Sequence, residues 1–245
     1  MNIIKELWQY GISGYLTEES MAAYVIWAPI LCAVCAYLLG SFNFSLLISK
    51  KKGSDIRNSG SGNAGATNMM RVYGKKYAIM TFVGDFLKAV VANIIGRILF
   101  GVLGAYIAGL FCIIGHAFPL YFKFKGGKGV VTLAAMGFMT EPLLTVILLV
   151  LFVFILFAFK MVSLASVMIA LIYPFAIYML RGEGLWFLIA LAVAILVIFL
   201  HRKNLVRIFN HTESKFKFKF KKKEKKSETI EETQDKEIKN EEDKE

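Results

Sequence analysis

Seven apolar segments, separated by short polar or basic stretches, follow one another between residues 21 and 200. About 20 apolar residues in a helix span the hydrocarbon core of a bilayer, so most of these segments are long enough to cross one. Val130–Met139 is too short to cross alone and would need neighbouring helices or a thinned bilayer. The pattern predicts an all-α, polytopic integral membrane bundle of about seven transmembrane helices, over Met21–Ile48, Tyr77–Phe100, Ala105–Tyr121, Val130–Met139, Leu143–Phe159, Met161–Leu180 and Leu185–Leu200.

Basic residues are unevenly distributed between the two ends of these helices. Eleven Lys and Arg residues share one side if Lys50–Lys76, Lys123–Lys128 and Lys160 face the same way, and only Arg97 and Arg181 lie near the other side. Cytoplasmic ends of membrane helices carry the excess of Lys and Arg. With seven spans, the N-terminus is therefore expected outside and the C-terminus in the cytoplasm.

The amino-acid composition indicates that the protein binds partners that carry phosphate. The chain is 57% hydrophobic and 19% charged, with a net charge of +11. Such an excess of cation is typical of proteins that meet anionic lipid, phosphate substrates or both. Only eight acidic residues precede position 215, which leaves little material for paired-carboxylate chemistry. The three cysteines lie in apolar segments and are predicted to be small buried hydrophobes: Cys32, Cys35 and Cys112.

The chain divides into three predicted parts. Residues 1–20 form a partly amphipathic extracytoplasmic lead, residues 21–214 form the membrane domain, and residues 215–245 form a disordered, charged cytoplasmic tail. In the tail, Lys215–Lys223 alternates Lys with Phe. This alternation favours contact of the basic tail with anionic lipid over contact with nucleic acid.

Three basic segments fall at the end that we predict to be cytoplasmic. The first glycine cluster, Gly53–Arg71, contains Arg57 and ends at Arg71; the second glycine cluster is Lys123–Gly129, and the C-terminal basic segment is His201–Arg207. Glycine lets backbone N–H groups approach a ligand closely, and Lys and Arg add charge and hydrogen-bond donors suited to phosphate. Each segment is therefore an anion-site candidate, and its alternative is a flexible, positively charged loop.

Motifs of several common enzyme classes are absent or out of context. Gly60-x-Gly62-x-x-Gly65 matches the dinucleotide fingerprint in letters only, because no strand precedes it. The second glycine cluster fails the ATPase pattern G-x-x-x-x-G-K-[ST]. No His is followed five residues later by an acid, G-x-S-x-G is missing, and no His, Cys or acidic group has metal-ligand spacing. We expect no metal and no cofactor.

Asp85, Lys88 and His116 are ionisable residues inside predicted spans. Asp85 and Lys88 are three residues apart and therefore on one helix face. They form either a structural ion pair or a substrate contact, and His116 is either a packing residue or a base. Groups of this kind usually point into a helix bundle, because exposing them to lipid is costly.

The three basic segments are similar to the three motifs of the bacterial acyl-phosphate:glycerol-3-phosphate acyltransferases. The resemblance covers about residues 25–216 and departs at Val131, where the family usually has Ala, and at His211, where it has Gly. The lead and the tail lie outside the family pattern. The matching stretches are Gly40-Ser41, Ser54–Asn68 with Arg71, Gly115-His116-x-x-Pro119, Phe124–Thr132, His201–Arg207 and Thr212-Glu213-x-Lys215.

The resemblance implies a seven-helix enzyme of the bacterial plasma membrane with its active site at the cytoplasmic face. It implies transfer of a fatty acyl group from acyl phosphate to the 1-hydroxyl of glycerol 3-phosphate, the first acylation in phospholipid synthesis. The products are lysophosphatidate and phosphate. The residues expected to be catalytic are Ser61, Arg71, Lys128, His201 and Asn204. Those expected to bind substrate are Gly60, Gly62, Asn63, Thr67, Asn68, Gly126, Gly127, Gly129 and Arg207.

Acyl phosphate already carries a good leaving group, so positioning and charge stabilisation are the expected tasks of the protein. Lys128 and the amides of Gly126–Gly129 are assigned to acyl phosphate. Glycerol 3-phosphate and the attacked carbonyl are assigned to Arg71, Asn204 and Arg207 with Ser61, and His201 supports them. The base is open between Asp55, Glu213 and the substrate's own phosphate. Ser61 as a covalent nucleophile is the alternative to direct transfer.

Two function classes compete with the enzyme. A transporter of organic phosphate would need polar residues in several spans and an internal repeat, whereas the spans after Val130 are nearly free of polar groups. A lipid-binding scaffold acting through the tail leaves the two glycine clusters unexplained. Deletion of residues 217–245 separates the enzyme from the scaffold, because the enzyme would keep its chemistry. Acyl-chain length and oligomeric state have no sequence signal here.

Overall fold

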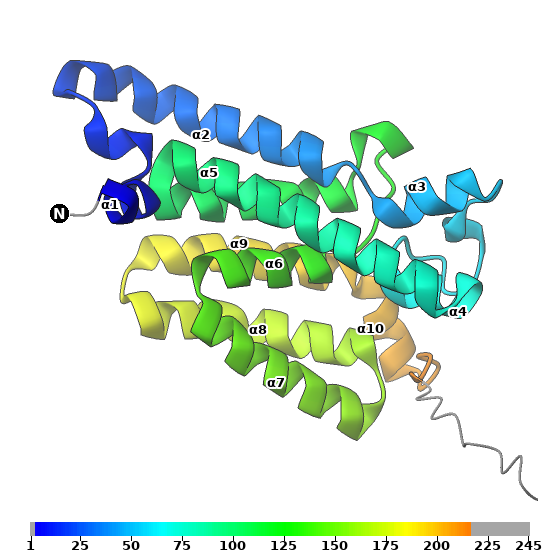
Figure 1. The fold of residues 1–245 in the computed structure, drawn as a ribbon. Helices are drawn as coiled ribbons and strands as arrows, with labels where there is room; N and C mark the ends of the chain where they lie inside the picture. Colours follow the sequence, from blue (N-terminus) through cyan, green and yellow to red (C-terminus); the bar gives the residue numbers. More distant parts are fainter. Residues whose placement is uncertain (1–2, 217–245) are drawn as a thin grey trace, which may run out of the picture. The chain divides into compact units, whose positions relative to one another are not determined.

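The computed structural model describes residues 3–216, and all regular secondary structure within this range is helical (Figure 1). The predicted all-α class is therefore confirmed for this part of the chain, while the predicted tail lies outside it beyond Phe216. In chain order the elements are α1 (Ile3–Tyr10), η1 (Ile12–Tyr15), α2 (Glu18–Gly40), α3 (Phe44–Lys51), η2 (Ile56–Asn58), α4 (Ala66–Tyr73), α5 (Lys75–Ala117), η3 (Leu120–Phe122), α6 (Val130–Thr140), α7 (Pro142–Phe159), α8 (Val162–Arg181), α9 (Gly184–Leu200) and α10 (Arg202–Phe209).

The first predicted span is broken. Met21–Ile48 was expected to form one helix, but α2 ends at Gly40 and α3 begins at Phe44. Asn43 causes the new start, because its side-chain oxygen accepts a hydrogen bond from the Leu46 amide at 3.2 Å and caps α3. The break leaves polar backbone groups inside the protein near the predicted cytoplasmic end.

The longest helix, α5, reverses direction. Its backbone leaves helical geometry at Phe100 and Gly101, and Gly101 has a φ of 58° that favours glycine. Gly96 and Gly104 pack against each other on either side, and a β-carbon on either would overlap the other's carbonyl group. α5 therefore consists of two antiparallel arms, which we call the first arm (residues 75–99) and the second arm (residues 102–117). They correspond to the predicted segments Tyr77–Phe100 and Ala105–Tyr121, joined by a tighter turn than expected.

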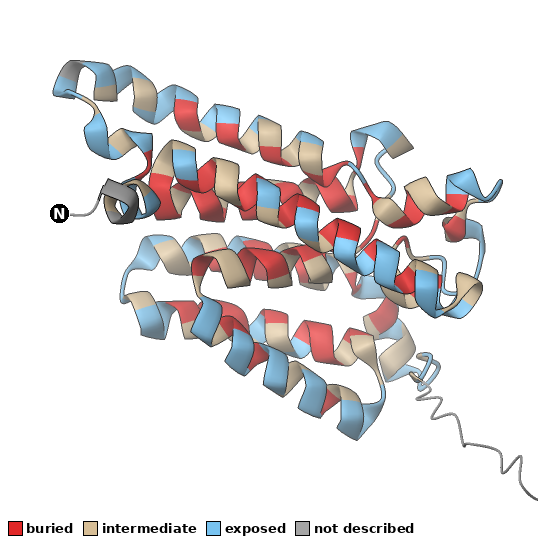
Figure 2. Cartoon of the chain, viewed as in Figure 1, coloured by how far each residue is buried: buried red, intermediate tan, exposed pale blue. Residues whose placement is uncertain are grey.

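Helix α2 packs along both arms of α5 through small side chains. The shared core contains Cys32 and Ala36 from α2, Ala89 from the first arm and Cys112 from the second. Small residues let membrane helices approach closely, which strengthens dispersion contacts where lipid offers no hydrophobic driving force. Buried residues accordingly follow the inner faces of these helices (Figure 2). The predicted cysteine behaviour holds for Cys32 and Cys112, which are buried and free, whereas Cys35 is half-buried.

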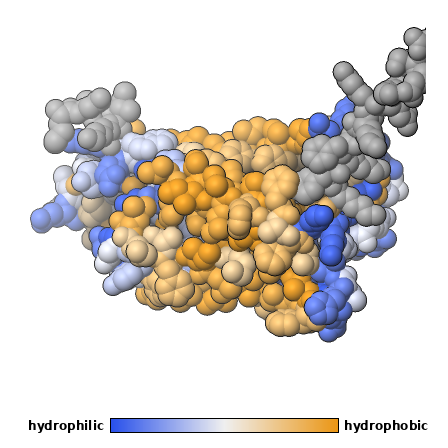
Figure 3. Space-filling model, turned by 90° about the horizontal axis from the view of Figure 1, so that it is seen from below, coloured by the Kyte–Doolittle hydropathy of each residue, from blue (hydrophilic) through white to orange (hydrophobic). Residues whose placement is uncertain are grey.

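Helices α6 to α9 cover the other side of the second arm. Tyr106 and Ile113 of that arm pack with Met136 of α6, Tyr173 of α8 and Val193 of α9. The outer faces are apolar and open. Space filling shows a broad hydrophobic surface with hydrophilic residues at its two ends (Figure 3). Among the described residues, four helical stretches are long and apolar enough to cross a membrane, or five when the α9–α10 pair, bent by 59°, counts as one span.

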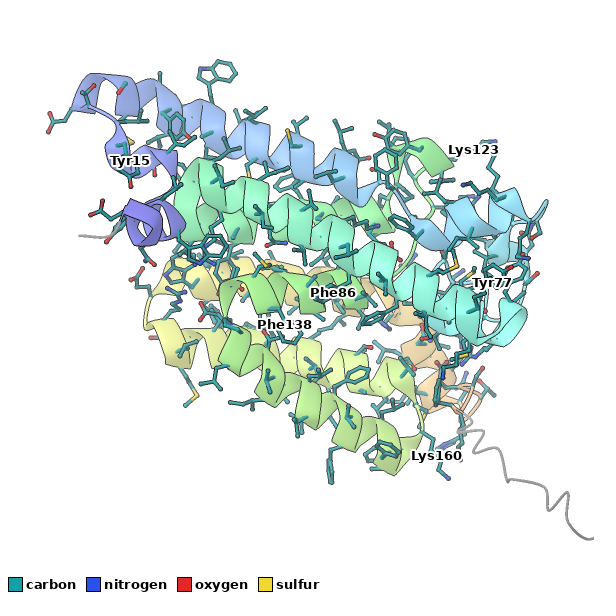
Figure 4. All side chains as sticks on the ribbon, in the orientation of Figure 1. Tyr15, Tyr77, Phe86, Lys123, Phe138 and Lys160 are labelled. Atoms are coloured by element: carbon teal, nitrogen blue, oxygen red, sulfur yellow. The ribbon has the colours of Figure 1, made fainter. Side chains whose placement is uncertain are left out.

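The end opposite the glycine clusters is fastened by two arginines. Arg97 donates from Nε to the Trp8 carbonyl at 2.8 Å, and Arg181 donates from Nε to Glu141 at 2.7 Å. Tyr15 lies at this end, whereas Tyr77, Lys123 and Lys160 lie at the other (Figure 4). Lys123 and Lys160, which were expected to share one side, therefore lie at the same end of the bundle.

Candidate functional site

The first glycine cluster is shaped by one buried amide. Asn68, at the start of α4, donates to the Ile56 carbonyl at 3.1 Å and to the Ser59 carbonyl at 2.9 Å, and it accepts from the Ser61 amide at 2.8 Å. Gly60 has a φ of 61°, and a β-carbon there would overlap the Asn68 oxygen. The predicted substrate contact by Asn68 does not fit these partners, because loop backbone occupies both its oxygen and its nitrogen.

Arg57 joins the two glycine clusters. Its Nε bonds to Asp55 at 2.9 Å, and one terminal nitrogen donates to the carbonyl groups of Phe122 at 3.0 Å and Lys125 at 2.8 Å. Arg57 therefore uses its donors to join the two clusters, which does not favour it as a free donor fork for phosphate. The same contact lowers the pKa of Asp55 through its hydrogen bond to Arg57, so this carboxylate is a weak candidate for the base.

The second glycine cluster uses two of its amides for structure. The Gly126 amide donates to the Ala117 carbonyl at 2.9 Å, and the Gly127 amide donates to the His116 carbonyl at 3.1 Å. Both amides therefore already have acceptors at the end of α5, which does not favour the prediction that they donate to acyl phosphate. Gly129, with a φ of 73°, then starts α6, whose first N–H groups have no acceptor within the helix. Lys128 and this helix start remain available to an anion.

Lys128 meets the C-terminal basic segment. Its ammonium group donates to the side-chain oxygen of Asn204, which is buried in α10. The Asn204 nitrogen donates to Glu213 at 2.7 Å, and Arg207 donates from Nε to the other Glu213 oxygen at 2.7 Å. Ser163, at the start of α8, adds a hydrogen bond to Glu213 at 2.6 Å. Residues 76 positions apart are thus held in direct contact.

Charge around Lys128 is mixed. Burial lowers the pKa of Lys128 to about 8, the positive charges of Arg207 and Arg71 act in the same direction, and Glu213 opposes them. For Glu213, burial works to raise the pKa, but hydrogen bonds from Ser163, Arg207 and Asn204 outweigh it and leave the pKa below its usual value. Glu213 is therefore a structural anion that holds two predicted site residues, and it is a weak candidate for the base.

The remaining predicted residues occupy two settings. Ser61, Gly62 and Arg71 are exposed, and Asn63 and Thr67 are half-buried, so the face of the first glycine cluster is open to a ligand. His201 is buried at the bend between α9 and α10, and its Nδ1 donates to the Val197 carbonyl at 2.8 Å. Its proton on Nδ1 leaves Nε2 as the acceptor nitrogen.

Sequence reasoning missed two parts of this arrangement. Ser163 has no motif around it, and the only hint was its position just after Lys160 at the same end of the bundle. Glu213 was considered as a candidate base, yet its side chain is 8% exposed and bonded to three neighbouring side chains. Within residues 3–216, no cluster of three or more His, Cys, Asp or Glu side chains is placed to hold a metal ion.

Comparison with known proteins supplies the chemistry. A family model described as "Glycerol-3-phosphate acyltransferase" matches residues 30–211. A protein of that name from Thermoanaerobacter sp. (strain X514) is 40% identical over 192 residues, 76% of this chain and 94% of the relative. One from Aquifex aeolicus (strain VF5) is 37% identical over 190 residues, 76% of this chain and 98% of the relative.

Two crystal structures of PlsY (YgiH), described as an integral membrane glycerol 3-phosphate acyltransferase, resemble this fold. The glycerol 3-phosphate form superposes with a TM-score of 0.73 at 34% identity, covering 77% of this chain and 96% of that one. The lysophosphatidic acid form superposes with a TM-score of 0.70 at the same identity, covering 77% and 95%.

Proposed function

Because this chain belongs to the glycerol-3-phosphate acyltransferase family and is an acyltransferase, we propose that it transfers a fatty acyl group from acyl phosphate to the 1-hydroxyl of glycerol 3-phosphate. The products are lysophosphatidate and phosphate. The observation that carries the proposal is the direct bond between Lys128 of the second glycine cluster and Asn204 of α10, near enough to Arg71 of the first glycine cluster for its charge to act on Lys128. The two glycine clusters and the C-terminal basic segment therefore line a single candidate site at one end of the bundle.

Two phosphate positions follow from the free donors. Lys128 and the first N–H groups of α6 bind the acyl phosphate. Gly126 and Gly127 pack against the end of α5 and hold this loop in place. Arg71, Arg207, Asn63 and Thr67 are assigned to glycerol 3-phosphate. Helix N-termini and fixed cations favour phosphate oxygens, which supports this division.

The transfer needs no covalent enzyme intermediate. The 1-hydroxyl oxygen attacks the acyl carbon, a carbon–oxygen ester bond forms, and the bond from that carbon to the phosphate oxygen breaks. Lys128 and Asn204 stabilise the negative charge that develops on the carbonyl oxygen and the leaving phosphate. Because Asp55 and Glu213 are both engaged and have lowered pKa values, the hydroxyl proton passes to the phosphate of glycerol 3-phosphate itself.

The membrane topology belongs to the same proposal. Counting α2, the two arms of α5, and α6 to α9 gives seven passages, with α6 the shortest at 11 residues. We assign the end with both glycine clusters to the cytoplasm of a bacterial cell, where a water-soluble phosphate substrate is available. The lead is then extracytoplasmic, and the basic tail lies on anionic lipid at the cytoplasmic face.

The test uses purified protein in detergent with labelled glycerol 3-phosphate, offered acyl phosphate, acyl-CoA or acyl-carrier protein in separate reactions. We expect lysophosphatidate from acyl phosphate, and its loss in Lys128→Ala with unchanged expression and melting temperature. Product from another donor alone would overturn the donor assignment. No product from any donor, with label accumulating inside reconstituted vesicles, would favour transport instead.

Ser61 separates direct transfer from an acyl-enzyme. Its backbone is held by Asn68, and its exposed side chain lies on the open face of the first glycine cluster. We expect no acylated protein after acyl phosphate is mixed alone with wild-type enzyme and the mixture is denatured. A covalent acyl group that disappears in Ser61→Ala would contradict direct transfer.

A further inference from the structure

A second polar cluster is buried behind the second glycine cluster. Asp85 and Lys88 of the first arm and His116 of the second arm are 2%, 7% and 4% exposed. Lys88 Nζ lies 2.8 Å from Asp85 and 3.0 Å from His116 Nδ1. These are ionisable groups inside membrane-spanning segments, and the proposed chemistry uses none of them directly.

The break between α2 and α3 explains why a lysine is buried here. Gly40 and Phe42 have carbonyl groups that the interrupted helix leaves without intrahelical partners. Lys88 Nζ donates to both carbonyl groups at 2.8 Å, and Asp85 balances its charge while accepting from the Phe44 amide at 3.4 Å. A buried charge that is both paired and hydrogen-bonded has a tolerable cost, so the cluster locks the α2–α3 break onto α5.

His116 extends the cluster to the proposed site. His116 Nδ1 lies 3.0 Å from Lys88 Nζ and 3.5 Å from Asp85 Oδ1, so both residues fix the orientation of its ring. The Nε2 atom of this ring faces Gly127, where a β-carbon would overlap both the ring and the Ala64 carbonyl of the first glycine cluster. The Gly127 amide also donates to the His116 carbonyl at 3.1 Å. Gly127 is thus held between the end of α5 and the first glycine cluster, one residue before Lys128.

We propose that Asp85, Lys88 and His116 form a positioning network. Its His116 ring packs against Gly127 and so places Lys128 for acyl-phosphate binding. The inference rests on the proposed role of Lys128 at acyl phosphate. His116 is the residue that contacts the loop, while Asp85 and Lys88 fix the orientation of its ring. The network therefore acts on the donor site and leaves the glycerol 3-phosphate site unchanged.

Two isosteric substitutions of His116 separate loop support from general packing. His116→Gln places its terminal amide near the position of Nε2 and keeps the reach to Gly127. His116→Asn keeps an oxygen near the position of Nδ1, where it can still contact Lys88, but its side chain is too short to contact Gly127. We expect the KM for acyl phosphate to rise about tenfold in His116→Asn and to stay within about threefold in His116→Gln, with the KM for glycerol 3-phosphate unchanged in both.

Thr81→Val is the matched control, because Thr81 is fully buried one turn before Asp85 and no hydrogen-bond partner is found for its hydroxyl in the described structure. We expect wild-type kinetics from it. Melting temperature and gel-filtration profile in detergent are measured for every variant. Equal changes in both KM values, or a lower melting temperature with unchanged KM values in His116→Asn, would make the network structural only and overturn the inference. Failure of the proposed function itself would differ, because the wild type would then make no lysophosphatidate from acyl phosphate.

Discussion

At the scale of single residues, several polar groups of the glycine clusters hydrogen-bond to other parts of the protein, so they are not free to bind a ligand. Asn68, Arg57, Gly126 and Gly127 are all committed to backbone partners. What remains free around them is a small set of donors with positive charge, chiefly Lys128 and Arg71. The hydrogen bonds of the committed groups fix the loops that carry these donors. Little reorganisation is therefore needed when a phosphate binds.

Lys128 should make activity sensitive to alkaline pH. Its pKa is lowered to about 8, so it is charged below that pH and loses its charge as pH rises through it. We expect kcat/KM for acyl phosphate, which reports the free enzyme, to fall above about pH 8. Lys128→Arg should abolish this decline at a lower overall activity, because Arg keeps its charge throughout the range.

A pH–rate profile from pH 6 to about 10 measures both enzymes, with spontaneous hydrolysis of acyl phosphate subtracted at each pH. The same alkaline decline in wild type and Lys128→Arg would show that another group titrates, and it would remove Lys128 from this role.

At the scale of elements, α2 and the second arm of α5 approach each other closely just before the α2–α3 break. A β-carbon at Gly40 would overlap the backbone of Cys112, and one at Gly115 would overlap that of Tyr37. The two helices can therefore touch only while these positions are glycine. Because Lys88 bonds to the Gly40 carbonyl, this contact also fixes the network behind Gly127.

Gly40→Ala should destabilise the protein. Forcing a methyl group into packed backbone costs about 1–3 kcal/mol, so we expect a lower melting temperature and a lower yield of monodisperse protein in detergent. Gly184→Ala is the control, because no atom lies within 4 Å of a β-carbon there. Equal melting temperatures for both variants would mean that α2 moves aside without cost.

At the scale of the whole molecule, the site needs parts from both ends of the sequence. The first glycine cluster, the second glycine cluster and α10 meet at one end, and the Arg97 and Arg181 contacts fasten the other. The apolar outer surface between them suits lipid (Figure 3). Substrates of mixed character, with a phosphate head and an acyl chain, would be met at the boundary between these surfaces.

Orientation in the membrane can be tested at the two ends of α9. Glu183 precedes this helix and Lys203 follows it, and both residues are exposed. In a background with all three native cysteines replaced, we expect Glu183→Cys to react with an impermeant maleimide on intact cells. Lys203→Cys should react only after lysis. The reverse labelling pattern would invert the proposed topology.

The sequence by itself determined the all-α membrane class, five of the apolar segments nearly to the residue, and the three basic segments that form the site. These features depend on local composition, since apolar length decides where a helix can cross a membrane. The resemblance to a known family rested on the same local stretches, and the family comparison bears it out.

Only the tertiary structure decided what each polar group does. The sequence predicts the Gly126 and Gly127 amides as phosphate donors and Glu213 as a candidate base. In the structure the two amides donate to the end of α5, and Ser163, Asn204 and Arg207 bond to Glu213. The carbonyl groups that the α2–α3 break leaves without helical partners bond to Lys88, which lies more than 40 residues further along the chain. Hydrogen-bond partners distant in sequence leave no local pattern, so which donors stay free for substrate is a property of the folded molecule.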